Sequence, residues 1–461
     1  MTASMHEWDD ETNLFAHSVI GYAIERLRLA KDPTWGALPA DALEHSLSGS
    51  VSPGGLGGVE ALRLFRDVLL PACRPMDDPL NLAFVPTAPS VAATMFDLVV
   101  SASSIFAGMW DAGAGAIAAE NTALRWLSDL AGYPHDAGGV FVSGGSAANL
   151  SALVTARDHH RRRSTQVSSA HRPTIVTTDE VHASVRAAAR VMDVDVLEVP
   201  TDEFGRLTGS ALASVLDTAG HPGVFAVVAT GGTTNAGAVD ELDAIADVCE
   251  EYGLWLHVDG AYGLAALCSS LARDSFKGVE RSHSFGVDPH KWLFAPYDCA
   301  ALVYRDPQPA ALAHAQHGAY LDAVDRSQWN PSDYAYHLSR RARGLPLWFS
   351  LATYGTDSYA TAVDASIQLA RDVAAEIDRR PGFRLLLQPQ LSIVLFTVEG
   401  WQLHDMKRWS DDRARAGRAL VVPTAWRGEP CLRMCFVNPR TSFDDVAAVL
   451  DDMAAWPVDA G

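Results

Sequence analysis

The chain has 461 residues, of which 48% are hydrophobic, 20% charged and 8% aromatic. At roughly 100–200 residues per domain this suggests two to four structural units, and the composition excludes wholesale disorder, a collagen-like fold and a coiled coil. Lys and Arg number 36 against 56 Asp and Glu, which gives a net charge of −20. Such a surface repels nucleic-acid phosphates and anionic lipid, so we expect neither nucleic acid nor a membrane as a partner.

The first segment, residues 1–75, is predicted to be mostly helical, because apolar residues such as Leu14 and Ile20 fall near helical spacing. A glycine-rich run at 54–58 interrupts this pattern before a second helix. Neither helix could make a large core alone, so this segment is expected to pack on something else, such as a second subunit.

Signals for export or membrane insertion are missing from the sequence. Residues 1–10 are acidic and lack the basic and apolar regions of a signal peptide. The longest apolar stretch, residues 90–110, contains Asp97 and several serines, which favours a buried helix over a membrane span. The six cysteines form no Cys-x-x-Cys pair, and in a chain this long they are expected to be reduced and mostly packed. These features predict a cytoplasmic protein.

Residues 76–335 alternate short apolar runs with helical patterns such as 241–252. Continuous apolar strands separated by helices predict an α/β fold with a largely parallel sheet. Ligands of such sheets bind at the carboxyl ends of the strands. The clearest of these runs are residues 139–142, 174–177, 224–229 and 254–258.

Residues 336–461 are predicted to form a small α+β domain. Its expected elements are a helix at 358–379, strands at 391–396 and 431–437, and a helix at 442–454. The basic run at 159–163 is expected to be a solvated helix end, so neither a metal site nor a nucleic-acid site is predicted from it.

The run Ser-Gly-Gly-Ser-Ala-Ala-Asn-Leu at residues 143–150 follows a predicted strand and opens a helix. Small residues let backbone N–H groups approach an anion, and a helix N-terminus adds positive potential. An ordinary turn before a helix would explain the run equally well. It has neither the P-loop spacing nor the Gly-x-Ser-x-Gly elbow, which weakens nucleotide-hydrolase and serine-hydrolase interpretations.

Three further motifs stand at strand ends. Asp259 ends an apolar strand, where a carboxylate is costly unless it meets a cation or a donor, although a helix cap or an ion pair would also explain it. The hydroxyl-rich run at 229–237 directly follows another strand and could be only a turn. Lys291 lies between a histidine and a tryptophan. Loss of hydration there would depress its pKa and free the amine as a nucleophile, whereas most lysines are surface charges.

One ligand would satisfy all of these motifs. It needs a phosphate for the 143–150 run, a carbonyl for Lys291 and a cationic ring nitrogen for Asp259. Pyridoxal 5′-phosphate carries all three, and an aspartate partner for its ring nitrogen is the expected contribution of the protein.

The sequence resembles the group II pyridoxal-phosphate-dependent amino-acid decarboxylases, the family of aromatic-amino-acid, glutamate and histidine decarboxylases, over about residues 55–455. The resemblance implies a fold-type I transferase-like architecture, with a mostly parallel seven-stranded sheet in residues 76–335 and a homodimer with shared active sites. The strings that carry it are Ser-Gly-Gly-Ser-Ala-Ala-Asn (143–149), Asp-Glu-Val-His-Ala-Ser-Val (179–185), Gly-Thr-Thr (232–234), His-Val-Asp-Gly-Ala-Tyr (257–262) and Asp-Pro-His-Lys-Trp-Leu (288–293).

The resemblance also implies a role for each matching residue. Lys291 would form a Schiff base with the cofactor, His182 would stack on its ring, and Asp259 would pair with its ring nitrogen. The other implied contacts are Gly145, Ser146 and His290 at the phosphate with Asp288 nearby, Ala261 against the ring, and Thr234 close to Asp259.

The sequence departs from the family pattern around the substrate. The segment containing Phe84 and Thr87, the expected substrate contacts, carries only one aromatic residue, so aromatic specificity (Trp, Tyr, Phe or DOPA) is a default. Arg433 matches a family arginine that could meet the substrate carboxylate, with a structural ion pair as the alternative.

The loop that ends near Tyr336 is shortened, so the family's proton-donating tyrosine cannot be placed without a gap. Of the three tyrosines at 320, 334 and 336, Tyr334 is the first choice, Tyr336 the second, and all three could merely pack. A mobile loop tyrosine suits a proton donor, because water must be excluded after CO₂ leaves.

The predicted activity is decarboxylation of an L-amino acid to an amine and CO₂. Alternatives are an aldehyde-forming or transaminating enzyme with the same cofactor, a decarboxylase of an aliphatic or acidic amino acid, and a PLP-binding homologue without activity. A nucleotide-binding enzyme is disfavoured, because the chain lacks a Walker-type sequence.

Overall fold

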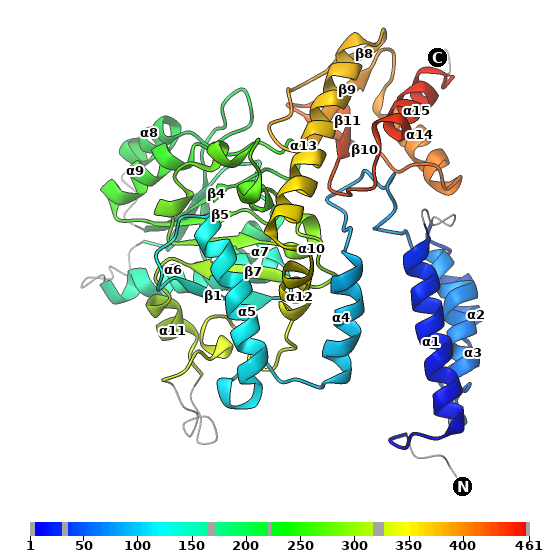
Figure 1. The fold of residues 1–461 in the computed structure, drawn as a ribbon. Helices are drawn as coiled ribbons and strands as arrows, with labels where there is room; N and C mark the ends of the chain where they lie inside the picture. The colour runs from blue at the N-terminus through cyan, green and yellow to red at the C-terminus, as the bar shows by residue number, and fades with distance from the viewer. Residues whose placement is uncertain (1–4, 30–35, 164–170, 220–222, 317–326, 458–461) are drawn as a thin grey trace.

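The computed structural model describes residues 5–29, 36–163, 171–219, 223–316 and 327–457 (Figure 1). Its body consists of a large α/β layer structure and a small antiparallel sheet with its own helices, and three N-terminal helices stand beside that body (Figure 1). None of the helices in these residues is long and apolar enough to cross a membrane.

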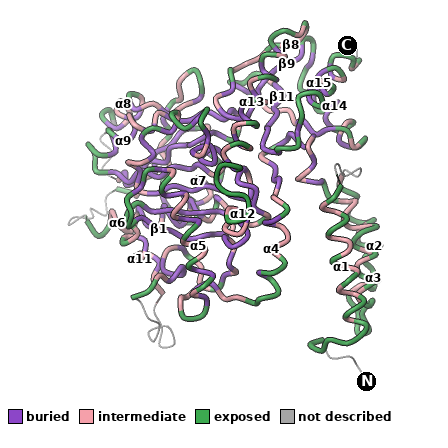
Figure 2. The backbone as a smooth tube through the Cα atoms, viewed as in Figure 1, coloured by how far each residue is buried: buried purple, intermediate pink, exposed green. Residues whose placement is uncertain are grey.

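The N-terminal helices are α1 (Asp10–Arg28), α2 (Ala40–Leu47) and α3 (Gly58–Leu64). The sequence predicted helices here without a core of their own, and none of the three has a buried residue. Figure 2 shows them as a column of exposed and half-buried residues apart from the buried interior. Arg26 of α1 reaches the rest of the chain through an ion pair of 2.8 Å with Asp77.

The large sheet has seven strands in the order β1-β7-β6-β5-β4-β2-β3. Strands β3, β2, β4, β5 and β6 pair in parallel, and β7 is antiparallel to both of its neighbours. The predicted α/β fold with a mostly parallel sheet is confirmed. The strands are β1 (Gly138–Val142), β2 (Thr174–Thr177), β3 (Asp195–Glu198), β4 (Val224–Thr230), β5 (Trp255–Asp259), β6 (Ser284–Val287) and β7 (Ala300–Tyr304).

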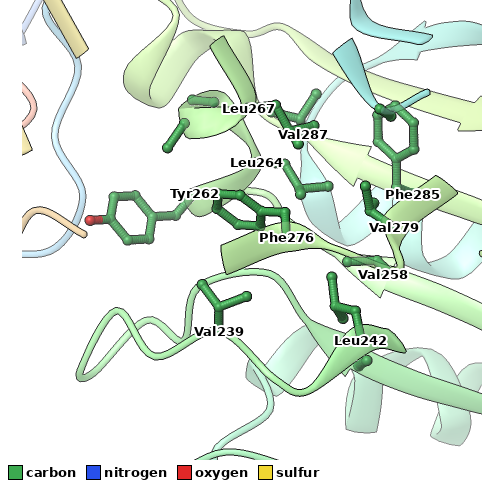
Figure 3. Packing of buried hydrophobic residues seen from close by; sticks show 14 of the residues in the cluster. Val239, Leu242, Val258, Tyr262, Leu264, Leu267, Phe276, Val279, Phe285 and Val287 are labelled. Atoms are coloured by element: carbon green, nitrogen blue, oxygen red, sulfur yellow. The ribbon is translucent and has the colours of Figure 1, made fainter. Parts of the chain in front are cut away.

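Both faces of this sheet are covered, which explains why its strands are apolar on both sides rather than alternating. Along β5, Leu256 and Val258 join one buried cluster and Trp255 joins the cluster on the opposite face. Figure 3 shows the first cluster, where Val258 and Phe285 pack with Leu242. The covering and connecting helices are α5 (Trp110–Leu130), α6 (Gly145–Arg163), α7 (Ala183–Met192), α8 (Gly209–Ala219), α9 (Leu242–Tyr252), α10 (Pro289–Trp292), α11 (Gln308–His314) and α12 (Leu345–Tyr354).

The C-terminal part holds a four-stranded antiparallel sheet in the order β10-β11-β9-β8. The predicted strands at 391–396 and 431–437 are present, each displaced by two residues, and Cys431 and Cys435 are buried in β11 as free thiols. The elements are α13 (Thr356–Arg379), β8 (Phe383–Leu385), β9 (Ile393–Val398), α14 (Leu403–Arg415), β10 (Val422–Trp426), β11 (Glu429–Cys435) and α15 (Phe443–Ala454).

The stretch 90–110 was expected to be one buried helix, and that prediction is wrong. Helix α4 (Val91–Ala102) occupies only its first half and lies on the surface of the protomer, with Val91 55% and Leu98 50% exposed. One face of α4 packs on α12, where Phe96 stacks on Phe349 with ring centroids 4.0 Å apart. On its other side Val91, Leu98 and Val99 stay exposed.

Candidate active site

The carboxyl ends of β5 and β6, the start of α6 and the segment after β2 meet around a cavity of about 270 Å³. This is where a parallel sheet places its ligands. Eight of the predicted cofactor residues line it, which are Gly145, Ser146, His182, Asp259, Ala261, Asp288, His290 and Lys291.

Lys291 lies on the four-residue helix α10, directly after β6. Its Nζ is 2.9 Å from Asp288 Oδ2, and its side chain is 23% exposed. Burial acts to lower the pKa of Lys291, but Asp288 and Asp259 outweigh it, so the pKa is raised. The expectation of a depressed pKa is therefore wrong, because it did not take the buried carboxylate of Asp288 into account. Without a bound carbonyl the Lys291 side chain is an ammonium.

The start of α6 fits the phosphate of the predicted cofactor. A Cβ added to Gly145 would lie 3.0 Å from the Ala261 side chain and 3.2 Å from Asp288 Oδ2, a tight fit that glycine avoids. The helix N-terminus and the Lys291 ammonium both favour an anion here. Asp288 is 2% exposed, and its Oδ1 is buried without a hydrogen-bond partner among the described residues, which marks a polar site rather than packed core.

Asp259 ends β5 and is buried. Its Oδ2 accepts a hydrogen bond of 2.8 Å from Asn149 Nδ2, and its Oδ1 accepts one of 3.2 Å from the Ala261 N–H. Both donors are neutral, and no ion pair reaches Asp259 within the described part of the chain. Its charge is thus left for a cation in the cavity, which suits the ring nitrogen of pyridoxal 5′-phosphate.

His182 and His290 both line the cavity, and each has one ring nitrogen held by a hydrogen bond. His182 caps α7, where its Nδ1 accepts from the Ser184 N–H at 3.2 Å. The Nδ1 of His290 donates to the Cys299 carbonyl at 2.8 Å, and burial lowers the pKa of His290. Ser146 and Ala261 also line the cavity.

The other predicted cofactor and substrate residues do not line the cavity. Thr234 lies exposed in the turn after β4. Thr87 is buried, and its hydroxyl donates to the Ala295 carbonyl at 3.4 Å. Phe84 is 57% exposed in a left-handed backbone conformation with φ of 57°.

Arg433 neither reaches the cavity nor forms the structural ion pair considered as its alternative. It is buried, and it donates to two backbone carbonyls, from Nη1 to Phe84 at 2.5 Å and from Nε to Asn235 at 3.1 Å. No carboxylate pairs with it among the described residues. The bond to Phe84 joins that segment to β11 of the small domain.

The predicted proton donor, Tyr334, lies outside the cavity lining. Its ring stacks on Trp329, with centroids 4.1 Å apart and planes 14° from parallel. The second choice, Tyr336, is 55% exposed, and Tyr320 lies outside the described residues. Proton donation by Tyr334 stays a prediction.

Six residues that line the cavity were not among the predicted site residues: Ser143, Gly144, Asn149, Ser184, Tyr297 and Asp298. Asn149 stands four residues after Gly145 and therefore lies one helical turn further along the same face, a spacing that could have pointed to it. Ser184 follows His182 by two residues. Tyr297 and Asp298 carry no sequence signal that separates them from an ordinary loop.

The fold and the site together define a pyridoxal-phosphate-dependent enzyme of the decarboxylase class. The family model described as the pyridoxal-dependent decarboxylase conserved domain matches residues 61–399. The chain belongs to this family and is a PLP-dependent amino-acid decarboxylase.

Similar proteins act on different substrates. The chain is 30% identical to an aromatic-L-amino-acid decarboxylase of Bacillus atrophaeus, covering 96% of this chain and 94% of the relative. It is 26% identical to an L-2,4-diaminobutyrate decarboxylase of Acinetobacter baumannii, over 90% and 86% of the two chains. The solved structure of Oryza sativa TDC with PLP and tryptamine has the same fold, with a TM-score of 0.91 at 24% identity over 98% of both chains.

Proposed function

We propose that this enzyme decarboxylates an aromatic L-amino acid to the corresponding amine and CO₂. The observation that carries the proposal is one cavity holding Lys291 against Asp288 and, within the same wall, Asp259 with only neutral donors. The aromatic class is favoured because similarity to the Bacillus decarboxylase extends over 96% of the chain.

In this proposal Gly145, Ser146 and His290 hold the cofactor phosphate, and His182 and Ala261 lie against its ring. When bound, pyridoxal 5′-phosphate accepts the electrons that the departing carboxyl group leaves on the substrate carbon. Asp259 keeps a proton on the cofactor's ring nitrogen, which stabilises charge where it develops.

Asp288 has a proposed part in preparing Lys291. The ammonium must lose a proton before its nitrogen can act as a nucleophile. The Oδ2 of Asp288, 2.9 Å from Nζ, is within reach to take that proton. The same carboxylate returns it when the lysine is displaced by the substrate amine.

Product analysis tests the activity and the substrate class together. The purified enzyme, loaded with PLP, is incubated with a panel of aromatic, acidic and diamino L-amino acids, and CO₂, amine, aldehyde and ammonia are measured. We expect equal CO₂ and amine from an aromatic substrate, and none from Lys291→Ala. Turnover confined to 2,4-diaminobutyrate or an acidic amino acid would reject the aromatic class, and aldehyde with ammonia would reject simple decarboxylation.

We also propose a homodimer whose subunits share the active sites. The helices α1–α3 contain no fully buried residue and expose Leu14, Ile20 and Val59, and α4 exposes Leu98. Covering such apolar surface is the main driving force of subunit association. Sedimentation at micromolar concentration should give a dimer, and an active monomer would refute the proposal.

A further inference from the structure

Asn149 is the branch point of a buried hydrogen-bond network beneath the cavity. It is 1% exposed in α6. Its Nδ2 donates to Asp259 Oδ2 at 2.8 Å and to Ser184 Oγ at 2.9 Å, and its Oδ1 lies 2.9 Å from His257 Nε2. One amide thereby uses both of its donors and its acceptor.

The direction of each hydrogen bond on the cavity side follows from Asp259. A carboxylate only accepts, so the amide nitrogen faces it. The same nitrogen donates to Ser184 Oγ, which leaves the Ser184 hydroxyl proton for His182 Nδ1, 2.8 Å away. A neutral His182 then carries its own proton on Nε2.

The deep side of the network fixes the orientation of the amide. Because Asn149 Oδ1 accepts, His257 Nε2 must carry a proton, and burial lowers the pKa of His257 to about 4, so the ring is neutral. Its Nδ1 accepts from Ser284 Oγ at 2.9 Å, which in turn accepts from Trp255 Nε1 at 3.0 Å. Each donor in this chain of hydrogen bonds, from Trp255 to Asn149, has an acceptor. Exchanging Oδ1 and Nδ2 of Asn149 would therefore break its bonds to both Asp259 and His257.

We propose that Asn149 is a positioning residue that holds Asp259 and His182 in one hydrogen-bonded unit, through Ser184 on the His182 side. The proposal rests on the proposed function, in which both residues contact the bound cofactor. Loss of the Asn149 amide removes one hydrogen bond from Asp259 and the bond that orients the Ser184 hydroxyl toward His182. Loss of the Ser184 hydroxyl removes one of the two bonds to His182 and leaves the Asn149–Asp259 bond in place.

A double-mutant cycle on cofactor affinity tests this unit. Dissociation constants for PLP are measured by equilibrium dialysis for the wild type, Asn149→Ala, Ser184→Ala and the double variant. Asn149→Ala should weaken binding about 10- to 100-fold, the range for losing a hydrogen bond to a charged group. The loss in the double variant should be at least about threefold smaller than the product of the two single losses, as expected for residues in one network.

Two further variants separate positioning from a general structural effect. Ser184→Thr keeps the hydroxyl and should bind PLP within about twofold of the wild type. Thr155→Val removes a buried hydroxyl of the same helix that bonds Ser151 and His314 outside the unit, and it should bind normally and combine multiplicatively with Asn149→Ala.

Multiplicative losses for Asn149→Ala and Ser184→Ala, or wild-type affinity in Asn149→Ala, would overturn the proposal. If Asn149→Ala does not fold, the two Ser184 variants test the proposal. Ser184→Ala must then weaken PLP binding, and Ser184→Thr must bind PLP like the wild type. Borohydride reduction of the wild type separates failure of the proposed function from failure of the positioning role of Asn149. Cofactor trapped on a lysine other than Lys291 would reject the proposed active site itself.

Discussion

The Glu120–Arg340 pair provides a test of how the segment before α12 is held. Both side chains are almost fully buried, at 2% and 0% exposure, and they meet in two parallel bonds of 2.7 Å. Glu120 also accepts from the Gly344 N–H at 2.7 Å, and Arg340 donates to the Ala107 carbonyl at 2.9 Å. The pair therefore joins α5 to the chain that follows Tyr336.

Replacing Glu120 with Met leaves the guanidinium buried, with the Ala107 carbonyl as its one remaining partner among the described residues. Removing one member of such a pair costs about 3–5 kcal/mol, a large part of the free energy of unfolding of a typical protein. Replacing Arg340 with Met as well removes the uncompensated charge, so the double variant should be more stable than Glu120→Met alone.

Urea unfolding followed by tryptophan fluorescence measures the effect. The control is Glu60→Ala, which breaks the Arg63–Glu60 pair in a helix where the side chains are 58% and 47% exposed, and should change the unfolding free energy by less than about 0.5 kcal/mol. A loss below about 1 kcal/mol in Glu120→Met, or a double variant less stable than the single one, would contradict the reasoning.

Three more predictions concern the site and its pH dependence. Borohydride reduction should attach the cofactor to Lys291, and Lys291→Ala should bind PLP without forming that bond; recovery of label on another lysine would be decisive against it. Tyr334→Phe should lower amine production by about 10²–10⁴, the range for a positioned proton donor, whereas production within about threefold of the wild type would mean that the ring, which stacks on Trp329 outside the cavity, only packs. Burial lowers the pKa of His283 and His337 to about 4, below their value in the unfolded chain. The unfolded state therefore binds more protons, and the melting temperature should fall as the pH drops from about 6.5 to 4; a constant melting temperature over that window would contradict the prediction.

The sequence predicted the cavity well because its residues follow strands. Asp259 and Lys291 come directly after apolar runs, and parallel strands bring their carboxyl ends to one edge. The network around Asn149 was not predictable in this way. Asn149 is 110 residues from Asp259 and 35 from Ser184, and only the packing of α6 on the sheet brings the three side chains together.

The predictions for residues outside strand ends were weaker for physical reasons. Thr234 follows Gly232, whose φ of 109° turns the chain in a direction that no spacing rule gives, and the side chain of Thr234 ends in solvent. The exposure of α4 depends on which of its faces meets a neighbour, and a mostly apolar helix carries only a weak periodic signal for that. The direction of the pKa shift of Lys291 depended on the distance to Asp288.

The reversal between β6 and β7 limits what can be changed near the reactive lysine. The two strands are antiparallel neighbours, so only residues 288–299 separate them and no crossover helix is needed. Within that short connection, the His290 N–H donates to the Cys299 carbonyl at 3.2 Å and the ring of His290 bonds the same residue. Lys291 is thus held close to the sheet by the end of β6 before it and by the bonds between His290 and Cys299, next to β7. Insertions or circular permutation within this connection would displace the lysine directly, whereas the exposed turn residues 203 and 204 should tolerate them.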